Sequence, residues 1–127
     1  MDLLDTQIFG LIGEAGLRQL VAAFYRRVPN DPILGAMYPQ ADLAGAEERL
    51  REFLIQRFGG PDHYSQKRGH PRLRMRHAPF KVDPQGRDRW IELMEAAMVE
   101  ADMPAAVVPV LRKFFHDAGT FMINHAG

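Results

Sequence analysis

Cysteine is absent from the sequence. Its absence excludes a disulfide framework, a thiolate nucleophile, an iron–sulfur cluster and a zinc ribbon. The chemistry of any functional site is therefore narrowed to histidine, carboxylate and hydroxyl side chains.

Net charge is absent as well, because 16 basic residues balance 16 acidic ones. No overall field would draw the chain to nucleic acid or to an anionic membrane surface, and we expect neither as a partner. The composition instead favours a small partner that is held in a pocket.

Long apolar runs are also missing, since no stretch approaches the roughly 20 uninterrupted apolar residues that span a bilayer. Residues 1–6 are acidic and lack a basic stretch followed by an apolar one, so they do not resemble a secretory signal. With 46% hydrophobic residues among 127, the chain suits one compact domain over residues 1–127. We expect a cytoplasmic, single-domain protein.

Apolar and polar residues nowhere alternate long enough to indicate a sheet. Apolar residues at three- and four-residue spacing instead predict long helices, in the segments 13–29, 42–58, 83–101 and 104–122. Asp42 suits the N-cap of the second helix, and Gly59-Gly60-Pro61 should end it. Asp83-Pro84 begins the third helix. The predicted fold class is all-α.

The segments between the long helices are predicted to be short. Residues 31–37 can form a helical turn that ends at the corner before Pro39, because the residue before a proline disfavours helical geometry. The polar residues 62–69 form a connector. A further short helix begins near Pro71, whose ring suits a first helical turn, and ends before Pro79.

The basic segment 72–78 is too short and too charged for an ordinary core helix, so something should hold it in place. Leu73 and His77 lie four residues apart on one face, which points the imidazole inward beside an apolar side chain. That arrangement suits a neutral ring that donates a lone pair to a metal. A hydrogen-bonded core or surface histidine fits the same pattern, and both interpretations stay open on these residues alone.

The other histidines point to no metal site. His63, His70 and His77 are seven residues apart and would align on one continuous helix, but Gly69 and Pro71 break such a helix. We therefore do not expect a three-histidine zinc site. His116 and His125 lie off the apolar stripe or in the tail, and we expect both at the surface.

A longer pattern runs through the same region of the chain. Its parts are Phe24-Tyr25, Tyr38-Pro39, Asp42 to Arg51, Gly59-Gly60-Pro61, Tyr64-Ser65, Arg68 to Leu73, Met75 to Phe80 and Trp90. This pattern resembles the group II truncated haemoglobins of bacteria, closely over residues 20–94 and elsewhere only in its helices. The resemblance implies a shortened globin fold, in which two helices cross over two others around haem, with an extended loop before the haem-binding helix.

The resemblance also implies haem b as cofactor, with its iron ligated by His77. One imidazole leaves the equatorial positions of the iron to a porphyrin, whereas a protein-only site would need more ligands. The haem-pocket wall is expected from Leu50, Phe53, Leu54, Leu73 and Phe80. For the two haem propionates the resemblance favours Arg76, Tyr64 and Arg49 over the neighbouring Arg68, Arg72 and Arg74. Arginines on a short exposed helix are also commonly just solvated, and that interpretation stays open.

On the ligand side, the family places hydrogen-bond donors at the positions of Tyr25, Tyr38 and Trp90. A buried hydroxyl or indole N–H needs a partner, and bound dioxygen, which carries partial negative charge, can supply one. Ala46 matches the position of the distal histidine in ordinary globins and, with Leu50, should line the ligand space. Alanine is equally a good helix former. Four phenylalanines are expected to fill the core and not to contact the bound gas: Phe24, Phe53, Phe114 and Phe115.

The function implied by the resemblance is reversible binding of dioxygen, and of carbon monoxide and nitric oxide, at ferrous haem. Storage, delivery and sensing all fit. The alternative is enzymatic: peroxidase-like turnover, or nitric oxide dioxygenation with electrons from an external reductase. The exposed face of a long helix could support a homodimer. A cofactor-free helical interaction module is a third alternative, but it leaves the segment 72–80 unexplained.

Overall fold

The computed structural model describes residues 3–78 and 80–126, and every regular element among them is helical. The elements in chain order are η1 (Asp5–Gln7), α1 (Ile8–Arg27), η2 (Gln40–Asp42), α2 (Leu43–Arg57), α3 (His63–Arg68), α4 (Leu73–His77), α5 (Pro84–Glu100) and α6 (Val108–Met122). The all-α prediction is confirmed, and the four long helices lie where apolar spacing placed them.

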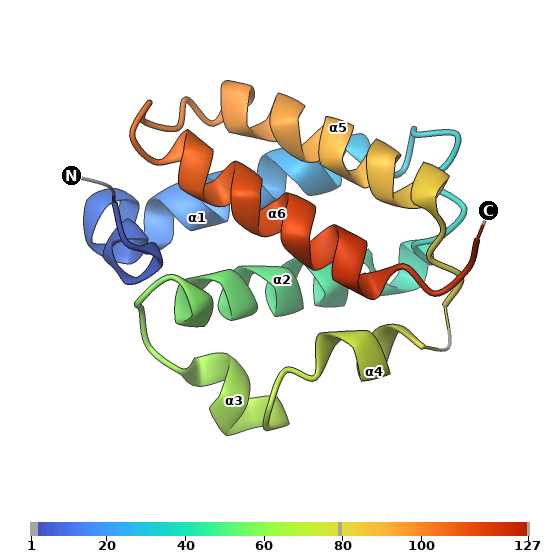
Figure 1. Cartoon of the computed structure of the whole chain (residues 1–127), viewed down its shortest axis with the longest axis horizontal. Coiled ribbons are helices and arrows are strands. Elements are labelled where there is room, and N and C mark those ends of the chain that lie inside the picture. Colours follow the sequence, from blue (N-terminus) through green and yellow to red (C-terminus); the bar gives the residue numbers. More distant parts are fainter. Residues whose placement is uncertain (1–2, 79, 127) are drawn as a thin grey trace.

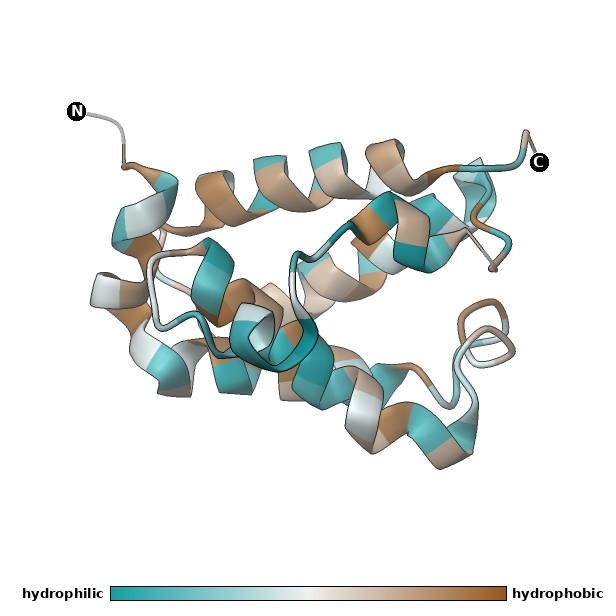
Figure 2. Cartoon of the chain, turned by 90° about the horizontal axis from the view of Figure 1, so that it is seen from below, coloured by the Kyte–Doolittle hydropathy of each residue, from teal (hydrophilic) through white to brown (hydrophobic). Residues whose placement is uncertain are grey.

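The four long helices form two packed pairs. Helix α1 packs against both α2 and α5, and α5 packs against α6 (Figure 1). The short helices lie on one side of these pairs, α3 against α2 and α4 against α6. Seen from that side, α3 is coloured largely hydrophilic (Figure 2). The core therefore lies between the long helices, and the short ones cover one side of it.

Helix α1 begins earlier than predicted, at Ile8 rather than near Gly13, because it is bent. Gly13 interrupts it with φ 66° and ψ −178°, a conformation that essentially only glycine adopts. By length and composition the span Asp5–Arg27 could cross a membrane. Its side chains Leu17 and Phe24 are fully buried between the other helices, however, so the apolar composition is that of a core helix.

The glycine stop after α2 reflects a close approach of two backbone segments. Gly59 has φ 103°, and a Cβ at this position would lie 2.1 Å from the carbonyl oxygen of Thr6. Phe9 N–H donates to the carbonyl oxygen of Phe58 at 2.9 Å, which joins the same two segments. Only glycine therefore lets the end of α2 pass this close to the start of the chain.

The two predicted helix caps have different outcomes. The side chain of Asp83 accepts a hydrogen bond from the Gly86 N–H at 2.8 Å, so α5 is capped as expected. Asp42 occupies the N-cap position of α2, but its side chain makes no capping hydrogen bond. It pairs with Arg49 instead, at 2.6 Å, so the predicted N-cap position is confirmed while the side chain that makes Asp42 a favourable cap is used elsewhere.

One short segment agrees with the prediction and one helix boundary differs. Residues 31–37 form hydrogen-bonded turns in which the Gly35 N–H donates to the Asp31 carbonyl oxygen one helical turn earlier, and the side chain of Asp31 accepts the N–H groups of Ile33 and Leu34 as an N-cap does. Helix α6 begins at Val108, one turn after Pro104.

The region before His77 departs from the predictions as well. Residues 62–69 are not a plain connector, since they contain α3. Helix α4 begins at Leu73 after Arg72 in a left-handed conformation, so Pro71 lies outside it. The predicted helix stop at Pro79 lies outside the described residues.

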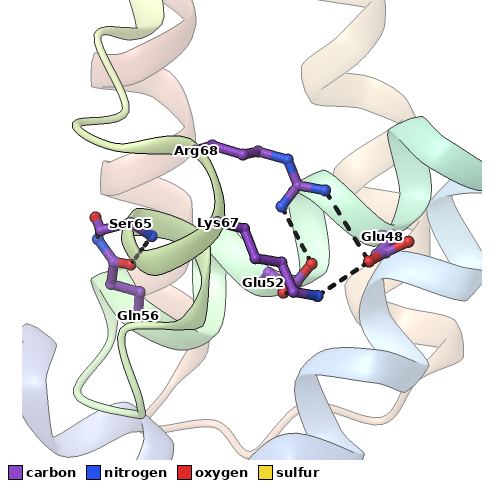
Figure 3. A network of polar contacts seen from close by, with 6 residues as sticks. All are labelled: Glu48, Glu52, Gln56, Ser65, Lys67 and Arg68. Carbon is purple, nitrogen blue, oxygen red and sulfur yellow. Dashed lines mark hydrogen bonds and ion pairs between the residues drawn. The ribbon is translucent and has the colours of Figure 1, made fainter.

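A polar network explains why α3 forms without an apolar stripe. Glu52 of α2, whose side chain is 9% exposed, pairs with Lys67 at 3.0 Å and with Arg68 at 3.2 Å (Figure 3). Burial by itself would raise the pKa of Glu52, but the hydrogen bonds from Lys67 and Arg68 hold that pKa below its usual value. Gln56 and Ser65 exchange two further hydrogen bonds between the helices, at 2.7 and 2.9 Å. Contacts with α2 therefore fix this short helix.

Candidate functional site

One cavity of about 510 Å³ opens among α1, α2, α4, α5 and α6. All thirteen residues that the sequence singled out for the site line it: Tyr25, Tyr38, Ala46, Arg49, Leu50, Phe53, Leu54, Tyr64, Leu73, Arg76, His77, Phe80 and Trp90. Their places in the chain span more than sixty positions, from α1 to α5. The structure thus brings the whole predicted set together, while the role of each residue stays a prediction.

His77 is the last residue of α4, and its ring is held from one side. The Nδ1 atom lies 2.7 Å from the carbonyl oxygen of Leu73, one helical turn earlier. A carbonyl oxygen only accepts, so Nδ1 carries the proton and Nε2 of the neutral ring keeps its lone pair. Histidines that bind metals are commonly oriented in this way by a hydrogen bond at their other nitrogen. The histidine is hydrogen-bonded, as one interpretation had it, and still offers a free ligand atom.

The other histidines do not join His77. His63 begins α3 and His70 lies beyond Gly69, which ends that helix with φ 76°. Within residues 3–78 and 80–126, no group of three or more His, Cys, Asp or Glu side chains could hold a metal ion. His116 and His125 are exposed, as expected.

Tyr25, Tyr38 and Trp90 form a cluster at the cavity. The rings of Tyr25 and Tyr38 meet edge to face with centroids 5.8 Å apart. Burial raises the pKa of Tyr38, and a hydrogen bond with Trp90 opposes that rise. An indole N–H can only donate, so the Tyr38 hydroxyl is the acceptor and its own proton remains available. Burial, followed by the nearby Tyr38, raises the pKa of Tyr25 far above its ordinary value, and its hydroxyl stays protonated.

The Tyr25 hydroxyl faces open space within the cavity. Among the described residues, no hydrogen bond engages it, yet no described side-chain nitrogen or oxygen is both fully enclosed and unpartnered. Since only 8% of Tyr25 is exposed and the residue lines the cavity, the hydroxyl borders the cavity itself. A hydroxyl in this position can donate a hydrogen bond to a group inside the cavity.

The cations near His77 differ in what they can reach. Arg76 lines the cavity, and its guanidinium donates to the carbonyl oxygens of Arg68 and His70 at 2.6 and 3.2 Å. Arg49 also lines it and is oriented by Asp42. Arg72 and Arg74 are exposed and do not line the cavity. Of the four arginines between residues 68 and 76, only Arg76 therefore lines the cavity.

Sequence reasoning missed the contribution of α6. Phe114 and Phe115 were expected only to fill the core, but both line the cavity, and Phe115 packs its ring 5.4 Å from that of Trp90. The small residues Ala118 and Gly119 follow on the same helix and also line the cavity. The sequence did contain a signal for this cavity wall. Ala118 and Gly119 follow Phe114 and Phe115 on one helix, and such small side chains leave space that a packed core would fill.

The cavity suits haem by its shape and its chemistry. Its volume lies within the range of cofactor sites, its walls are mainly aliphatic and aromatic, and cationic side chains lie at its edge. It offers a single imidazole lone pair as a metal ligand. One such ligand is enough for an iron that a porphyrin already binds, whereas a metal ion held by protein alone needs more. The donor set therefore fits haem.

Comparison with known proteins gives the same assignment. The sequence model of bacterial-like globins matches residues 7–124. The chain is 42% identical over 87 residues to the group 2 truncated haemoglobin YjbI of Bacillus subtilis (strain 168), an alignment that covers 68% of this chain and 65% of that protein.

Solved structures agree over nearly the whole chain. The haemoglobin of the thermophilic phototroph Chloroflexus aurantiacus is 49% identical with a TM-score of 0.88, over 93% of this chain and 98% of that one. The truncated oxygen-avid haemoglobin of Bacillus subtilis is 34% identical with a TM-score of 0.87, over 91% and 98%. The chain therefore belongs to the bacterial-like globin family, as a group II truncated haemoglobin with the two-over-two globin fold, and like its family it is a haem-binding globin for diatomic gases.

Proposed function

We propose that the protein binds dioxygen reversibly, with His77 ligating the iron of haem b and Tyr25, Tyr38 and Trp90 stabilising the bound gas. Haem held by His77 would supply a ferrous iron atom that binds a diatomic gas reversibly. The observation that carries the proposal is the convergence of three polar aromatic side chains on the cavity that His77 also lines.

The three donors come from parts of the chain other than α4. Tyr25 lies on α1, Tyr38 at the corner before η2, and Trp90 on α5, whereas α4 packs against α6. Each donor can therefore reach a ligand without competing with His77. The indole of Trp90 orients the Tyr38 hydroxyl, so these two act as a pair, and Tyr25 acts separately.

The strength of such hydrogen bonds favours slow release. A hydrogen bond to a charged group contributes roughly 1.5 to 3 kcal/mol, which slows dissociation about ten- to a hundredfold per donor. Two or three donors would make dioxygen binding tight. In support, the similar structure from Bacillus subtilis is that of an oxygen-avid haemoglobin.

The test is the absorption spectrum of the purified protein with haem, before and after dithionite and then carbon monoxide. We expect a sharp Soret band that shifts at each step. In the variant His77→Ala this spectrum should be lost or become that of loosely held haem, whereas the exposed His116→Ala should behave as wild type. A normal spectrum in His77→Ala would show that another residue ligates the iron.

Peroxidase-like turnover is a second candidate, favoured by a continuous set of aromatic contacts. The rings of Tyr25, Phe24, Trp90 and Phe115 follow one another with centroids 5.1, 5.2 and 5.4 Å apart. Of these, the phenol of Tyr25 and the indole of Trp90 can donate electrons to an oxidised centre. Rapid turnover of peroxide with a reducing substrate would favour this function, and nitric oxide dioxygenation would need electrons from a partner reductase.

A further inference from the structure

The segment after α4 is held by a residue from the opposite end of the chain. Asn124 follows α6, and its Nδ2 donates to the carbonyl oxygens of Phe80 at 2.9 Å and of His77 at 3.3 Å. Its Oδ1 accepts from the Val82 N–H at 2.8 Å. The backbone N–H of Asn124 donates to the Val82 carbonyl oxygen, also at 2.8 Å. One asparagine thus contacts the backbone of His77, Phe80 and Val82.

The chemistry of the partners fixes the orientation of this amide. Both groups near Nδ2 are carbonyl oxygens, which only accept, and the Val82 N–H near Oδ1 only donates. The ring of His125 adds a contact to Oδ1 from Nδ1 at 2.6 Å. A flipped amide would place like groups against one another at three positions. Asparagine is therefore required here by hydrogen-bonding pattern and not only by size.

Helix α4 depends on such outside support. It contains only five residues and none of them is buried. A helix this short does not form by its own hydrogen bonds, because the free-energy cost of nucleating a helix exceeds the stabilisation that a single turn contributes. The bond from Nδ1 to the Leu73 carbonyl fixes the ring of His77 relative to α4. Asn124 fixes the end of α4 relative to the long helix α6.

We propose that Asn124 is a positioning residue for His77: its amide sets the place and tilt of the imidazole relative to the cavity. The inference rests on the proposed function in taking His77 as the iron ligand. Asn124 does not line the cavity and so acts only through the backbone that carries the ligand. It adds a side chain that sequence patterns gave no reason to assign to the site.

The first test compares Asn124→Asp with Asn30→Asp in the haem-loaded protein. Aspartate keeps the shape of asparagine but turns an oxygen toward the two carbonyls. The control Asn30→Asp adds the same negative charge at an exposed position elsewhere on the chain. We expect haem transfer to excess apomyoglobin to be about tenfold faster in Asn124→Asp alone. The iron–histidine stretching band in the Raman spectrum should shift or broaden. An unchanged band and rate would overturn the proposal.

A second variant and a second measurement keep these results interpretable. Should Asn124→Asp fail to fold, Asn124→Ala removes both the Nδ2 bonds and the Oδ1 bond without adding charge, and we expect the iron–histidine band to shift or broaden there too. In the haem-free protein, the Val82 amide hydrogen should exchange slowly in wild type and faster in Asn124→Ala, which lacks the Oδ1 acceptor. Asn124→Asp keeps an acceptor oxygen there, so its Val82 exchange should stay close to that of wild type. Faster exchange in Asn124→Ala would support the contact even if haem uptake itself failed, which would instead reject the proposed function. Equal Val82 exchange in wild type and Asn124→Ala would overturn the inference.

Discussion

Arg89 holds the carboxylate of Asp31 by two donors on a single oxygen: Nε and Nη2 lie 2.6 and 2.5 Å from Oδ1. The other oxygen accepts the backbone N–H groups of Ile33 and Leu34 at 3.0 and 2.8 Å. This carboxylate therefore joins the turns at 31–37, which lead directly to Tyr38, onto the helix that carries Trp90. The geometry between those two ligand-side residues depends on an ion pair outside the cavity.

The first prediction concerns acid stability and the variant Asp31→Asn. Hydrogen bonds from Arg89, and from the Leu34 and Ile33 N–H groups, outweigh burial and hold the pKa of Asp31 below its ordinary value. A lowered folded-state pKa adds stability above the unfolded-state pKa, about 3.9, and that contribution is lost as the pH falls through the folded-state value.

Urea unfolding of wild type and Asp31→Asn across this range should therefore show a difference in stability that is full at neutral pH and shrinks below about pH 4. Asp102→Asn, at an exposed site outside the ion pairs of the described residues, should track wild type throughout. A difference for Asp31→Asn that stays constant with pH would argue against the ion pair.

The second prediction separates ligand release from cofactor retention. Tyr25→Phe removes a hydroxyl that borders the cavity, and Trp90→Phe removes the donor that orients Tyr38. Dioxygen dissociation measured by stopped flow should accelerate roughly ten- to a hundredfold in each. Tyr64→Phe removes the hydroxyl of a cavity residue that we expect to bind a haem propionate, so it should loosen haem and leave dioxygen dissociation nearly unchanged. The reverse pattern would exchange the roles that we give to these tyrosines.

The third prediction concerns space at Ala46. Leucine has nearly the helix propensity of alanine, so Ala46→Leu should leave α2 intact while it fills part of the cavity. Flash photolysis should show slower carbon monoxide rebinding than in wild type. Ala44→Leu places the same side chain on an exposed part of the same helix and should rebind normally. Equal rates in the two variants would mean that residue 46 does not limit access.

The fourth prediction concerns the glycine after α2. Gly59→Ala forces a left-handed conformation on alanine and a Cβ against the Thr6 carbonyl, so it should lower the free energy of unfolding by about 2 kcal/mol or more. Gly10→Ala meets nothing within 4 Å on an exposed part of α1 and should raise it by about 0.4 to 1 kcal/mol. Urea unfolding measures both free energies of unfolding. If both substitutions changed this free energy in the same direction, the close approach at Gly59 would not be the reason for the effect.

The elements that the sequence predicted well are those fixed by local patterns. Apolar spacing located the four long helices because each buries one face against its neighbours, as Leu17 and Phe24 do on α1. The four-residue interval between Leu73 and His77 likewise pointed the imidazole to the cavity, because the interval spans a single turn of α4.

The features that were missed depend on residues far apart in the chain. Asp42 looks the same whether it caps α2 or pairs with Arg49, and only the folded arrangement decides between them. Helix α3 has no apolar stripe to reveal it and is fixed by Glu52 from another helix. Asn124 reaches a carbonyl 47 positions earlier, which no spacing rule covers.

The five exposed or half-exposed residues of α4 also bear on how the chain is degraded. Arg74 and Arg76 lie within this helix, and Arg72 directly precedes it. An element without buried side chains opens before the core does, and a ligand that binds only the folded form keeps it closed. Trypsin should therefore cut the haem-free protein first after these arginines and spare them once haem is bound, which limited digestion followed by mass spectrometry would show. The lifetime of the chain in the presence of proteases would then follow its haem supply, because empty copies expose a cleavable segment while the long helices are still folded.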